Sequence, residues 1–552
     1  MRRSNFFLAA GLVAAALCGC HRQAAQDASA SLSPVSLEEV RVGGELAERI
    51  SRNFDRLETT LYQPDSVFWT EEESGGWPAD KEGRTILALV LDARASGRKP
   101  VYLDTMLTIL PTRLNEKGYL GTIHTPVVDE QQLSGHGWLL RGLCEYFEWT
   151  GDSSALNVAR GIAENLFLPV NDAISRYPVD SIARHKDVGD MSGSAQEIVN
   201  GWRLSSDVGC VFIGMEGLIH YYAHDRNPRI KELIDNMINL YLGIDLAGVR
   251  AQTHASLTAL RGILRYAAIT GDYSLIPEVE TRWALYRNRG MTENFENYNW
   301  FDRFDTWTEP CAVIDSYIVA MQLWQSTRRP EYLADADRIY YNGICMEQRA
   351  NGGFGCDTPV GRESDYIGIH ADEAHWCCTM RGGEGLSRVA QYTWFIAGDS
   401  IFVPVYHAST LTLPERGLKL IEQTDYPFGD TVKFTFEEVP GKAFTLALVS
   451  PADVKVLELS VNGKPTDMTV KDGFYHISRD FKKGDIVELT YAADERQVAT
   501  HYDPSSYKLM RGPLVLSTVA EGDSLTPLYH LMSPSVSQAN DFRRHILYHN
   551  HK

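Results

Sequence analysis

A helical unit that recurs between residues 40 and 400 is the feature that most constrains what this chain can fold into. In each unit an apolar pattern of helical spacing stops at a Gly-Asp pair, where the glycine suits the left-handed end of one helix and the aspartate can cap the next. The runs 136–149, 257–269 and 389–396 stop at Thr150-Gly151-Asp152, Thr270-Gly271-Asp272 and Ala397-Gly398-Asp399. Such repetition predicts an (α/α)6 toroid over residues 37–399, whose inner helices start at one central pocket. An open helical solenoid is the alternative.

The hydrophobic period changes after Asp399. Short runs rich in β-branched and aromatic residues follow at 401–406, 431–436 and 444–449, and Val461-Asn462-Gly463-Lys464 is typical of a hairpin turn. We therefore expect a β-sandwich domain over residues 400–552, with a C-terminal tail. The predicted fold class is mainly α with β, a toroid followed by a β-sandwich.

The N-terminus is typical of a bacterial lipoprotein signal. Met1-Arg2-Arg3 is positively charged, the apolar run 6–17 is too short to span a bilayer, and Leu17-Cys18-Gly19-Cys20 ends it with small residues. We predict a signal peptide over residues 1–20, lipidation of Cys20 and a flexible tether over 21–36. The chain would then lie in the periplasm or on the outer-membrane surface, touching the membrane only through its lipid. An ordinary secretory signal is the alternative.

Charge excludes one class of partner. The chain carries 53 Lys and Arg against 72 Asp and Glu, a formal net charge of -19. Such a surface repels phosphate backbones, so we expect no nucleic-acid partner.

Carboxylates and aromatic residues alternate between Met291 and Cys311, where Glu293, Glu296 and Glu309 lie among six Phe, Tyr and Trp residues. Aromatic rings stack on sugars, and a partly buried carboxyl group acquires a raised pKa that suits proton donation. This segment indicates a glycosidase pocket, although an acidic loop with its aromatic residues turned into the core would have the same sequence.

Cysteines indicate a metal site. Cys377 and Cys378 are adjacent and so poorly suited to a mutual disulfide, whereas thiolates with a carboxylate form ordinary tetrahedral zinc sites. Glu309 and Cys311 are separated by one residue, which on an extended segment directs both side chains to the same side. Glu309, Cys311, Cys377 and Cys378 are therefore the predicted zinc ligands.

These motifs together resemble glycoside hydrolase family 127, the β-L-arabinofuranosidase family. Glu309-Pro310-Cys311, followed 66 residues later by Cys377-Cys378, carries the resemblance most specifically. Gly135-His136, Thr253-His254-Ala255, Tyr341-Asn342-Gly343 and, in the sandwich, Arg511-Gly512-Pro513 fall in the family's order.

The resemblance implies a retaining exo-glycoside hydrolase that acts on an oligosaccharide or glycan. The same four zinc ligands are implied, with the first of the adjacent cysteines, Cys377, as the nucleophile. The family's acid/base, 16 residues before the zinc glutamate, falls on Glu293, with Glu296 in reserve. His136 and His254 are implied to line the pocket and bind sugar hydroxyls.

The sequence also departs from the family. Thr379-Met380-Arg381 replaces the usual Pro-Pro-Asn, and Cys210 and Cys356 stand near positions of a pocket His and Tyr. Arg381 and Arg388 could instead bind an acidic substituent of the sugar, or simply pair with Glu384 or cap a helix. A non-catalytic glycan-binding lipoprotein, and a lyase or uronyl hydrolase on the same toroid, are the alternative functions.

Overall fold

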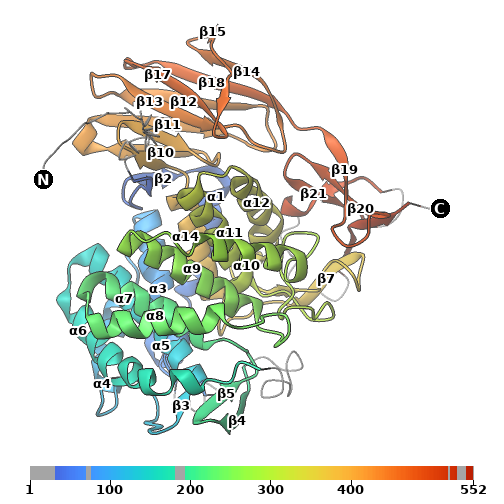
Figure 1. Ribbon diagram of the computed structural model, residues 1–552. Coiled ribbons are helices and arrows are strands. Elements are labelled where there is room, and N and C mark those ends of the chain that lie inside the picture. Colours follow the sequence, from blue (N-terminus) through green and yellow to red (C-terminus); the bar gives the residue numbers. More distant parts are fainter. Residues whose placement is uncertain (1–30, 70–75, 181–192, 520–522, 531–541, 551–552) are drawn as a thin grey trace, which may run out of the picture.

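The computed structural model describes residues 31–69, 76–180, 193–519, 523–530 and 542–550 (Figure 1). The predicted signal peptide and Cys20 lie outside the described residues. In the described part of the chain, no helix combines the length and apolar character needed to cross a bilayer.

Helices form a closed ring over the first two thirds of the described chain (Figure 1). The inner ring consists of α3 (Asp80–Ser96), α5 (Glu130–Thr150), α7 (Val211–Asp225), α9 (Thr253–Thr270), α11 (Pro310–Thr327) and α14 (Cys378–Gln391). The outer layer consists of α1 (Gly44–Leu57), α4 (Leu103–Arg113), α6 (Ser153–Ile162), α8 (Pro228–Leu242), α10 (Ile276–Arg289) and α12 (Glu331–Ile339). Each inner helix packs on the next and α14 packs on α3, which confirms the toroid and excludes an open solenoid.

One of the three Gly-Asp turns has the full predicted geometry, and a second has it in part. Gly151 ends α5 with φ of 74°, and the Asp152 side chain accepts a hydrogen bond from the N–H of Ser154 at the start of α6. After α9, Gly271 has the same φ of 74° and Asp272 accepts from the N–H of Ser274, but α10 begins only at Ile276 with Leu275 as its N-cap residue, so Asp272 does not cap it. These turns reverse the chain between an inner and an outer helix.

The prediction of a third such turn at residues 397–399 is wrong. Helix α14 already ends at Gln391, and β8 (Phe395–Ala397) turns through Gly398, with φ of 58°, into β9 (Ser400–Val403). The β-branched and aromatic residues 393–396 favour a strand, and pairing with β9 and β1 supplies their hydrogen bonds.

Glycines let the inner helices approach closely. A Cβ atom at Gly217 of α7 would lie 2.2 Å from the carbonyl oxygen of Gly137 of α5, and one at Gly83 of α3 would lie 2.2 Å from the Leu139 nitrogen. Helices whose backbones touch cannot shift along one another, because protein interiors are close-packed. The starting points of these helices are thereby fixed relative to each other.

Two sheets form the sandwich above the ring (Figure 1). One has the order β1 (Ser33–Pro34), β8, β9, β13 (Phe444–Val449), β17 (Phe474–Arg479) and β16 (Val470–Lys471). The other has the order β15 (Lys464–Pro465), β14 (Lys455–Val461), β18 (Ile486–Ala492), β12 (Thr431–Glu438), β11 (Leu418–Thr424), β10 (Ser409–Leu413) and β2 (Val40–Val42). Asn462 and Gly463, both with positive φ, make the predicted hairpin turn.

The N-terminal described residues belong to this sandwich. Ser33 and Pro34 pair with β8, and Leu32 and Val35 are buried. Residues 32–35 of the predicted tether are therefore part of the sandwich, because these apolar side chains have a core to enter. Residues 21–30 of the predicted tether lie outside the described residues.

A third sheet follows the sandwich and packs beside the ring. Its order is β19 (Glu495–Ala499), β20 (Ser506–Arg511), β21 (Leu514–Ser517) and β22 (Thr526–Pro527), with β24 (Leu547–His549) also paired to β20. Strand β23 (Arg543–His545) pairs with β7 (Tyr366–Ala371), which with β6 (Cys356–Asp357) extends from the helical domain. The described part of the predicted tail thus belongs to these sheets.

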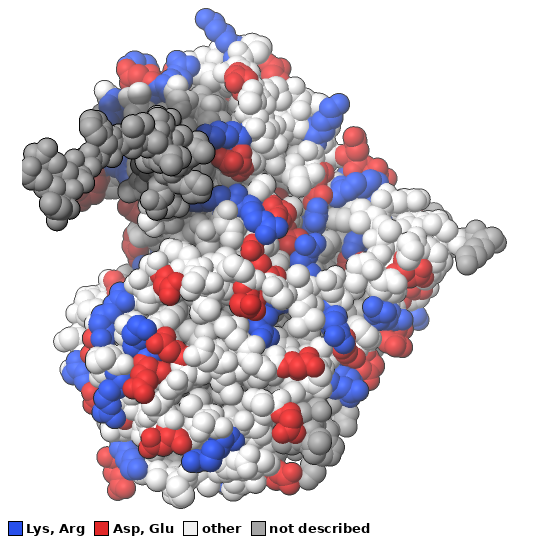
Figure 2. Space-filling view, in the orientation of Figure 1, with Lys and Arg blue, Asp and Glu red and all other residues white. Residues whose placement is uncertain are grey.

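Acidic and basic side chains are intermixed over the visible face of the molecule (Figure 2).

Candidate active site

A cavity of about 610 Å³ opens at the end of the ring where the inner helices begin. Asp80, His254 and Cys378 come from the first turns of α3, α9 and α14, while Glu309 and Cys377 occupy the N-cap positions of α11 and α14. Helix N-termini carry partial positive charge, so anionic side chains are favoured at this end of the ring.

Three thiols meet at this cavity. The sulfur atoms of Cys311, Cys377 and Cys378 all lie within 4.8 Å of one another, at 3.1 Å for Cys377 to Cys378 and 3.7 Å for Cys311 to Cys378. No disulfide joins them. Cys377 is half-buried, whereas Cys311 and Cys378 are buried, so Cys377 is the most accessible of the three.

Glu309 lies beside the thiols and is held from several directions. Its Oε1 is 3.3 Å from Nδ1 of His254, and with Cys311 these groups form a second cluster within 4.8 Å. In the orientation that satisfies both of its neighbours, the Asn299 amide donates to Oε2 at 2.8 Å and accepts from Nε1 of Trp307 at 3.0 Å. The carboxylate is therefore fixed in place before any ligand binds.

Arg84 links the thiols to a second carboxyl group. Its Nη1 donates to the sulfur of Cys311 at 3.3 Å and its Nε to Oδ2 of Asp80 at 2.8 Å. Burial opposes ionisation of Cys311, but hydrogen bonds with the other two thiols and the charge of Arg84 outweigh it and hold the pKa of Cys311 well below its usual value. Burial raises the pKa of Asp80, with Arg84 opposing, and Oδ1 of Asp80 has no hydrogen-bond partner among the described residues.

A network of buried charges supports this layer from below. Nε2 of His254 is 3.4 Å from Oδ2 of Asp315, which also accepts from the Thr258 hydroxyl at 2.6 Å. Arg261 and Arg381 both pair with Oδ1 of Asp315. All of these side chains are buried, so the network fixes the ring of His254 under Glu309.

Three of the four predicted zinc ligands, the cysteines, are thus gathered, and the fourth, Glu309, lies within 4.8 Å of Cys311, whereas the predicted proton donor lies elsewhere. Glu293 lies outside the cavity, buried between the ring and the third sheet. Its carboxylate contacts Nδ1 of His501 and Nζ of Lys508, each at 2.6 Å. Burial opposes ionisation, but these partners lower the pKa of Glu293 to about 2, which suits an interdomain ion pair and not a proton donor.

The reserve candidate Glu296 also lies outside the cavity wall. It is buried beside Asp357 and Glu347, with Arg349 as the nearby cation. Burial and the neighbouring carboxylates raise the pKa of Glu296 well above its usual value.

The two predicted pocket histidines have different positions. His254 lines the cavity, but both of its ring nitrogens face carboxylates of the protein. His136 lies outside the cavity wall, where its Nε2 accepts from the N–H of Leu120 at 3.0 Å and its Nδ1 faces the Gln132 carbonyl at 2.7 Å. Both ring nitrogens of His136 therefore face backbone groups of the protein and not a sugar in the cavity.

The arginines considered for an acidic sugar are also occupied. Arg381 pairs with Asp315 and Glu384, and Arg388 pairs with Glu145 at the far end of the ring. Neither lines the cavity, which removes the support for an acidic substituent. Cys356 does line it, whereas Cys210 does not.

Asp80 and Arg84 were missed by the sequence reasoning. Their i, i+4 spacing on a helix start was available as a signal, but such pairs are common on exposed helices, so it did not stand out.

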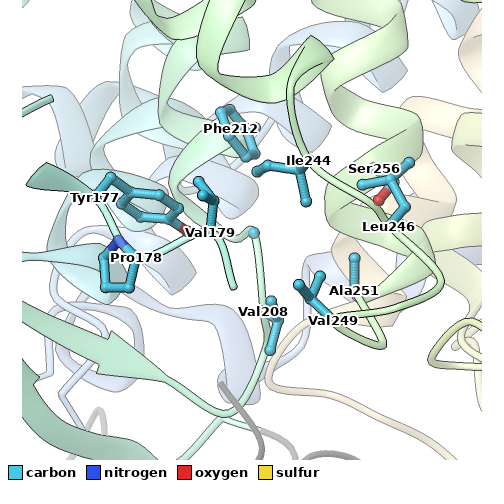
Figure 3. Close-up of a pocket in the computed structure, with 11 residues that line it drawn as sticks. Tyr177, Pro178, Val179, Val208, Phe212, Ile244, Leu246, Val249, Ala251 and Ser256 are labelled. Atoms are coloured by element: carbon cyan, nitrogen blue, oxygen red, sulfur yellow. The ribbon is translucent and has the colours of Figure 1, made fainter. Parts of the chain in front are cut away.

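A separate apolar crevice lies beside α7 and is lined by side chains such as Tyr177, Val208 and Phe212 (Figure 3). It has a volume of about 10 Å³ and no charged lining residue. It has room for little more than one water molecule.

Comparisons with known proteins agree with this arrangement. The model of the β-L-arabinofuranosidase GH127 catalytic domain matches residues 101–391, more than half of the chain, and that of the GH127 middle domain matches 400–493. No curated protein matches the chain.

Solved structures share the fold over most of the chain. A glycoside hydrolase superposes with a TM-score of 0.67 at 19% identity, covering 89% of this chain and 84% of that one. A GH127 β-arabinofuranosidase gives 0.65 at 16% identity, covering 89% and 86%. The GH127 β-L-arabinofuranosidase Ara127N from Geobacillus stearothermophilus T6 gives 0.63 at 18% identity, covering 88% and 87%.

The placement of Glu293 predicts a role in stability. Glu293→Gln leaves Lys508 buried without its counter-charge, so we expect a loss of about 3–5 kcal/mol at pH 7. Because the folded pKa of about 2 lies below the ordinary 4.5, the ionised carboxylate stabilises the fold above pH 4.5, and this contribution is lost as the pH falls from 4.5 toward 2. Urea unfolding of parent and variant at pH 7 and pH 4 measures the difference.

The exposed Glu278 of α10 provides the control, since Glu278→Gln removes a charge without breaking a buried pair. Equal stability of the Glu293→Gln variant and the parent at pH 7 would contradict the structural role.

Proposed function

Since the chain belongs to glycoside hydrolase family 127, we propose that it is a retaining, exo-acting β-L-arabinofuranosidase-type enzyme with Cys377 as its nucleophile. The observation that carries this proposal is the cluster of the Cys311, Cys377 and Cys378 thiols, with Glu309 beside Cys311, at the cavity that the described inner helices open into at their N-termini. A glycoside hydrolase acts on glycans, and an oligosaccharide or glycan is accordingly the substrate class.

The donor set fits zinc. Three sulfurs and one carboxylate oxygen are ordinary ligands of a tetrahedral zinc ion. The three sulfurs lie within 4.8 Å of one another, and a carboxylate oxygen of Glu309 lies within 4.8 Å of the Cys311 sulfur. Glu309, Cys311, Cys377 and Cys378 would hold the ion, which when bound keeps the thiols ionised at neutral pH. His254 and Asn299 act on Glu309 from outside this set.

The reaction follows from the position of Cys377. Its sulfur is the accessible one, and it attacks the anomeric carbon of the terminal sugar as the bond to the leaving oxygen breaks. That oxygen takes a proton from a carboxyl group. Water, deprotonated by the same carboxylate, then attacks the anomeric carbon and expels the thiolate, so two inversions give net retention.

Asp80 is the carboxyl group best placed to move this proton. It lines the cavity and lies one guanidinium away from Cys311, and its buried Oδ1 has no hydrogen-bond partner among the described residues. The other cavity carboxylates are committed, Glu309 to its supporting contacts and Asp207 to the Gly193 N–H. Glu293 is held by Lys508 and His501 instead.

The donor set favours hydrolysis over the alternatives. A binding protein without catalysis has no need of three converging thiols, and a lyase or uronyl hydrolase on this toroid would use His, Tyr and Asp without thiolates. Lipidation of Cys20, attachment to the membrane through that lipid and a periplasmic or outer-membrane location stay predictions.

Replacing the nucleophile tests the covalent step. Cys377→Ser should lower kcat on an aryl β-L-arabinofuranoside by at least about 1,000-fold, because a hydroxyl at this position is a far weaker nucleophile than a thiolate. Because Cys377 is also a proposed zinc ligand, circular dichroism and metal content are measured in parallel, and the loss of activity is assigned to catalysis alone only when the variant keeps the fold and the ion. Cys144→Ala, which alters a buried thiol of α5 away from the cavity, is the matched control. Near-parental activity of the Cys377→Ser variant would refute the covalent mechanism.

The proton donor is tested through the leaving group. Asp80→Asn should slow cleavage of a methyl glycoside, whose leaving group needs a proton, by about 100- to 10,000-fold. Cleavage of a dinitrophenyl glycoside should fall much less, because that leaving group departs without protonation. Glu293→Gln should show no such dependence on the leaving group. If the dependence appears in Glu293→Gln and not in Asp80→Asn, the assignment of Asp80 is wrong.

A further inference from the structure

An exposed indole stands directly beside the proposed nucleophile. Trp376 precedes Cys377 in the chain, lines the same cavity and leaves 49% of its surface accessible, in a protein where six tryptophans are fully buried. Its only described ring contact is an edge contact with His375, at 5.0 Å and 81° between the planes. A large apolar ring left open inside a cavity is unusual unless a ligand covers it.

A second aromatic wall of the cavity is rigidly built. Trp307 stacks face to face on His370, with ring centres 5.0 Å apart and planes 5° apart, and its edge contacts Trp300. Its Nε1 donates to Asn299, the residue that also donates to Glu309. The orientation of this wall is therefore tied to the proposed metal ligand.

The cavity that both tryptophans line exceeds the needs of one pentose. A cavity of about 610 Å³ is in the range that encloses ligands of several rings, not a single monosaccharide. Trp376 and Cys377 are consecutive residues and both line this cavity, so a ring lying on Trp376 is near the reacting sulfur. With the cleaved sugar at that sulfur, the indole is available to the unit attached to it.

We propose that Trp376 is the platform for the leaving part of the substrate, and that this part is a sugar ring of an oligosaccharide and not a small alcohol. The inference rests on the proposed function and adds the identity of the aglycone. The apolar face of a sugar ring stacks on an indole, while polar groups that line the same cavity, such as Lys81 and His375, can form hydrogen bonds with the sugar hydroxyls. Trp376 thereby determines specificity without taking part in bond cleavage.

Two substrates with the same cleaved sugar test the proposal, methyl β-L-arabinofuranoside and a β-L-arabinofuranosyl disaccharide. Trp376→Ala should lower kcat/KM for the disaccharide by about tenfold more than for the methyl glycoside, mainly through KM, since one stacking surface is lost. Trp376→Phe should recover most of the loss because it keeps an aromatic face. Tyr273→Ala, which removes another exposed aromatic residue far from this cavity, should change neither value.

Each outcome has a distinct meaning. If the parent enzyme cleaves both substrates and Trp376→Ala lowers kcat/KM equally for both, or for neither, the platform is refuted while the proposed function stands. If the parent enzyme cleaves neither substrate, the proposed function fails first.

Discussion

The buried ion-pair network along the axis of the ring is the interaction on which the reaction centre depends. Asp315 receives Arg261 and Arg381 on one oxygen and faces His254 with the other, and His254 in turn contacts Glu309. Charges buried in this way are tolerated only when every one is paired, so the loss of a single member leaves another uncompensated. The network therefore holds Glu309 in one position.

The toroid supplies the rest of the geometry. Its inner helices start together because glycines set their spacing, and their N-termini surround the thiols with partial positive charge. Arg84 adds a full charge at Cys311. The pKa of Cys311 is lowered, whereas hydrogen bonding with Cys311 raises the pKa of Cys377 and burial raises that of Cys378, so the proposed zinc ion is what would keep these two thiols ionised. Cys377 is the accessible thiol of the three. The sandwich and the third sheet pack against the outside of the ring, and the ion pair between Glu293 and Lys508 joins the third sheet to it.

What the sequence could predict is local. The adjacency of Cys377 and Cys378 and the one-residue gap between Glu309 and Cys311 predicted that the two segments meet, which the cluster of three thiols confirms. The Gly-Asp turns predicted the ring. The direction of a side chain in a loop was not predictable, because Glu293 turns toward a lysine that lies 215 residues later in the chain. His136 likewise lies on an inner helix, but its side chain accepts a hydrogen bond from the N–H of Leu120 in a nearby loop. The role proposed for Asp80 depends on its contact with Arg84, which in turn contacts the distant Cys311, and this arrangement exists only in the folded chain.

X-ray absorption at the zinc edge, combined with elemental analysis of the purified full-length chain, tests the central claim most directly. The account predicts one zinc per chain with three sulfur ligands at about 2.3 Å and one oxygen ligand at about 2.0–2.2 Å. Loss of one sulfur ligand in a Cys311→Ser variant would identify the site. Absence of zinc, or a zinc ion bound only by nitrogen and oxygen, would contradict the account.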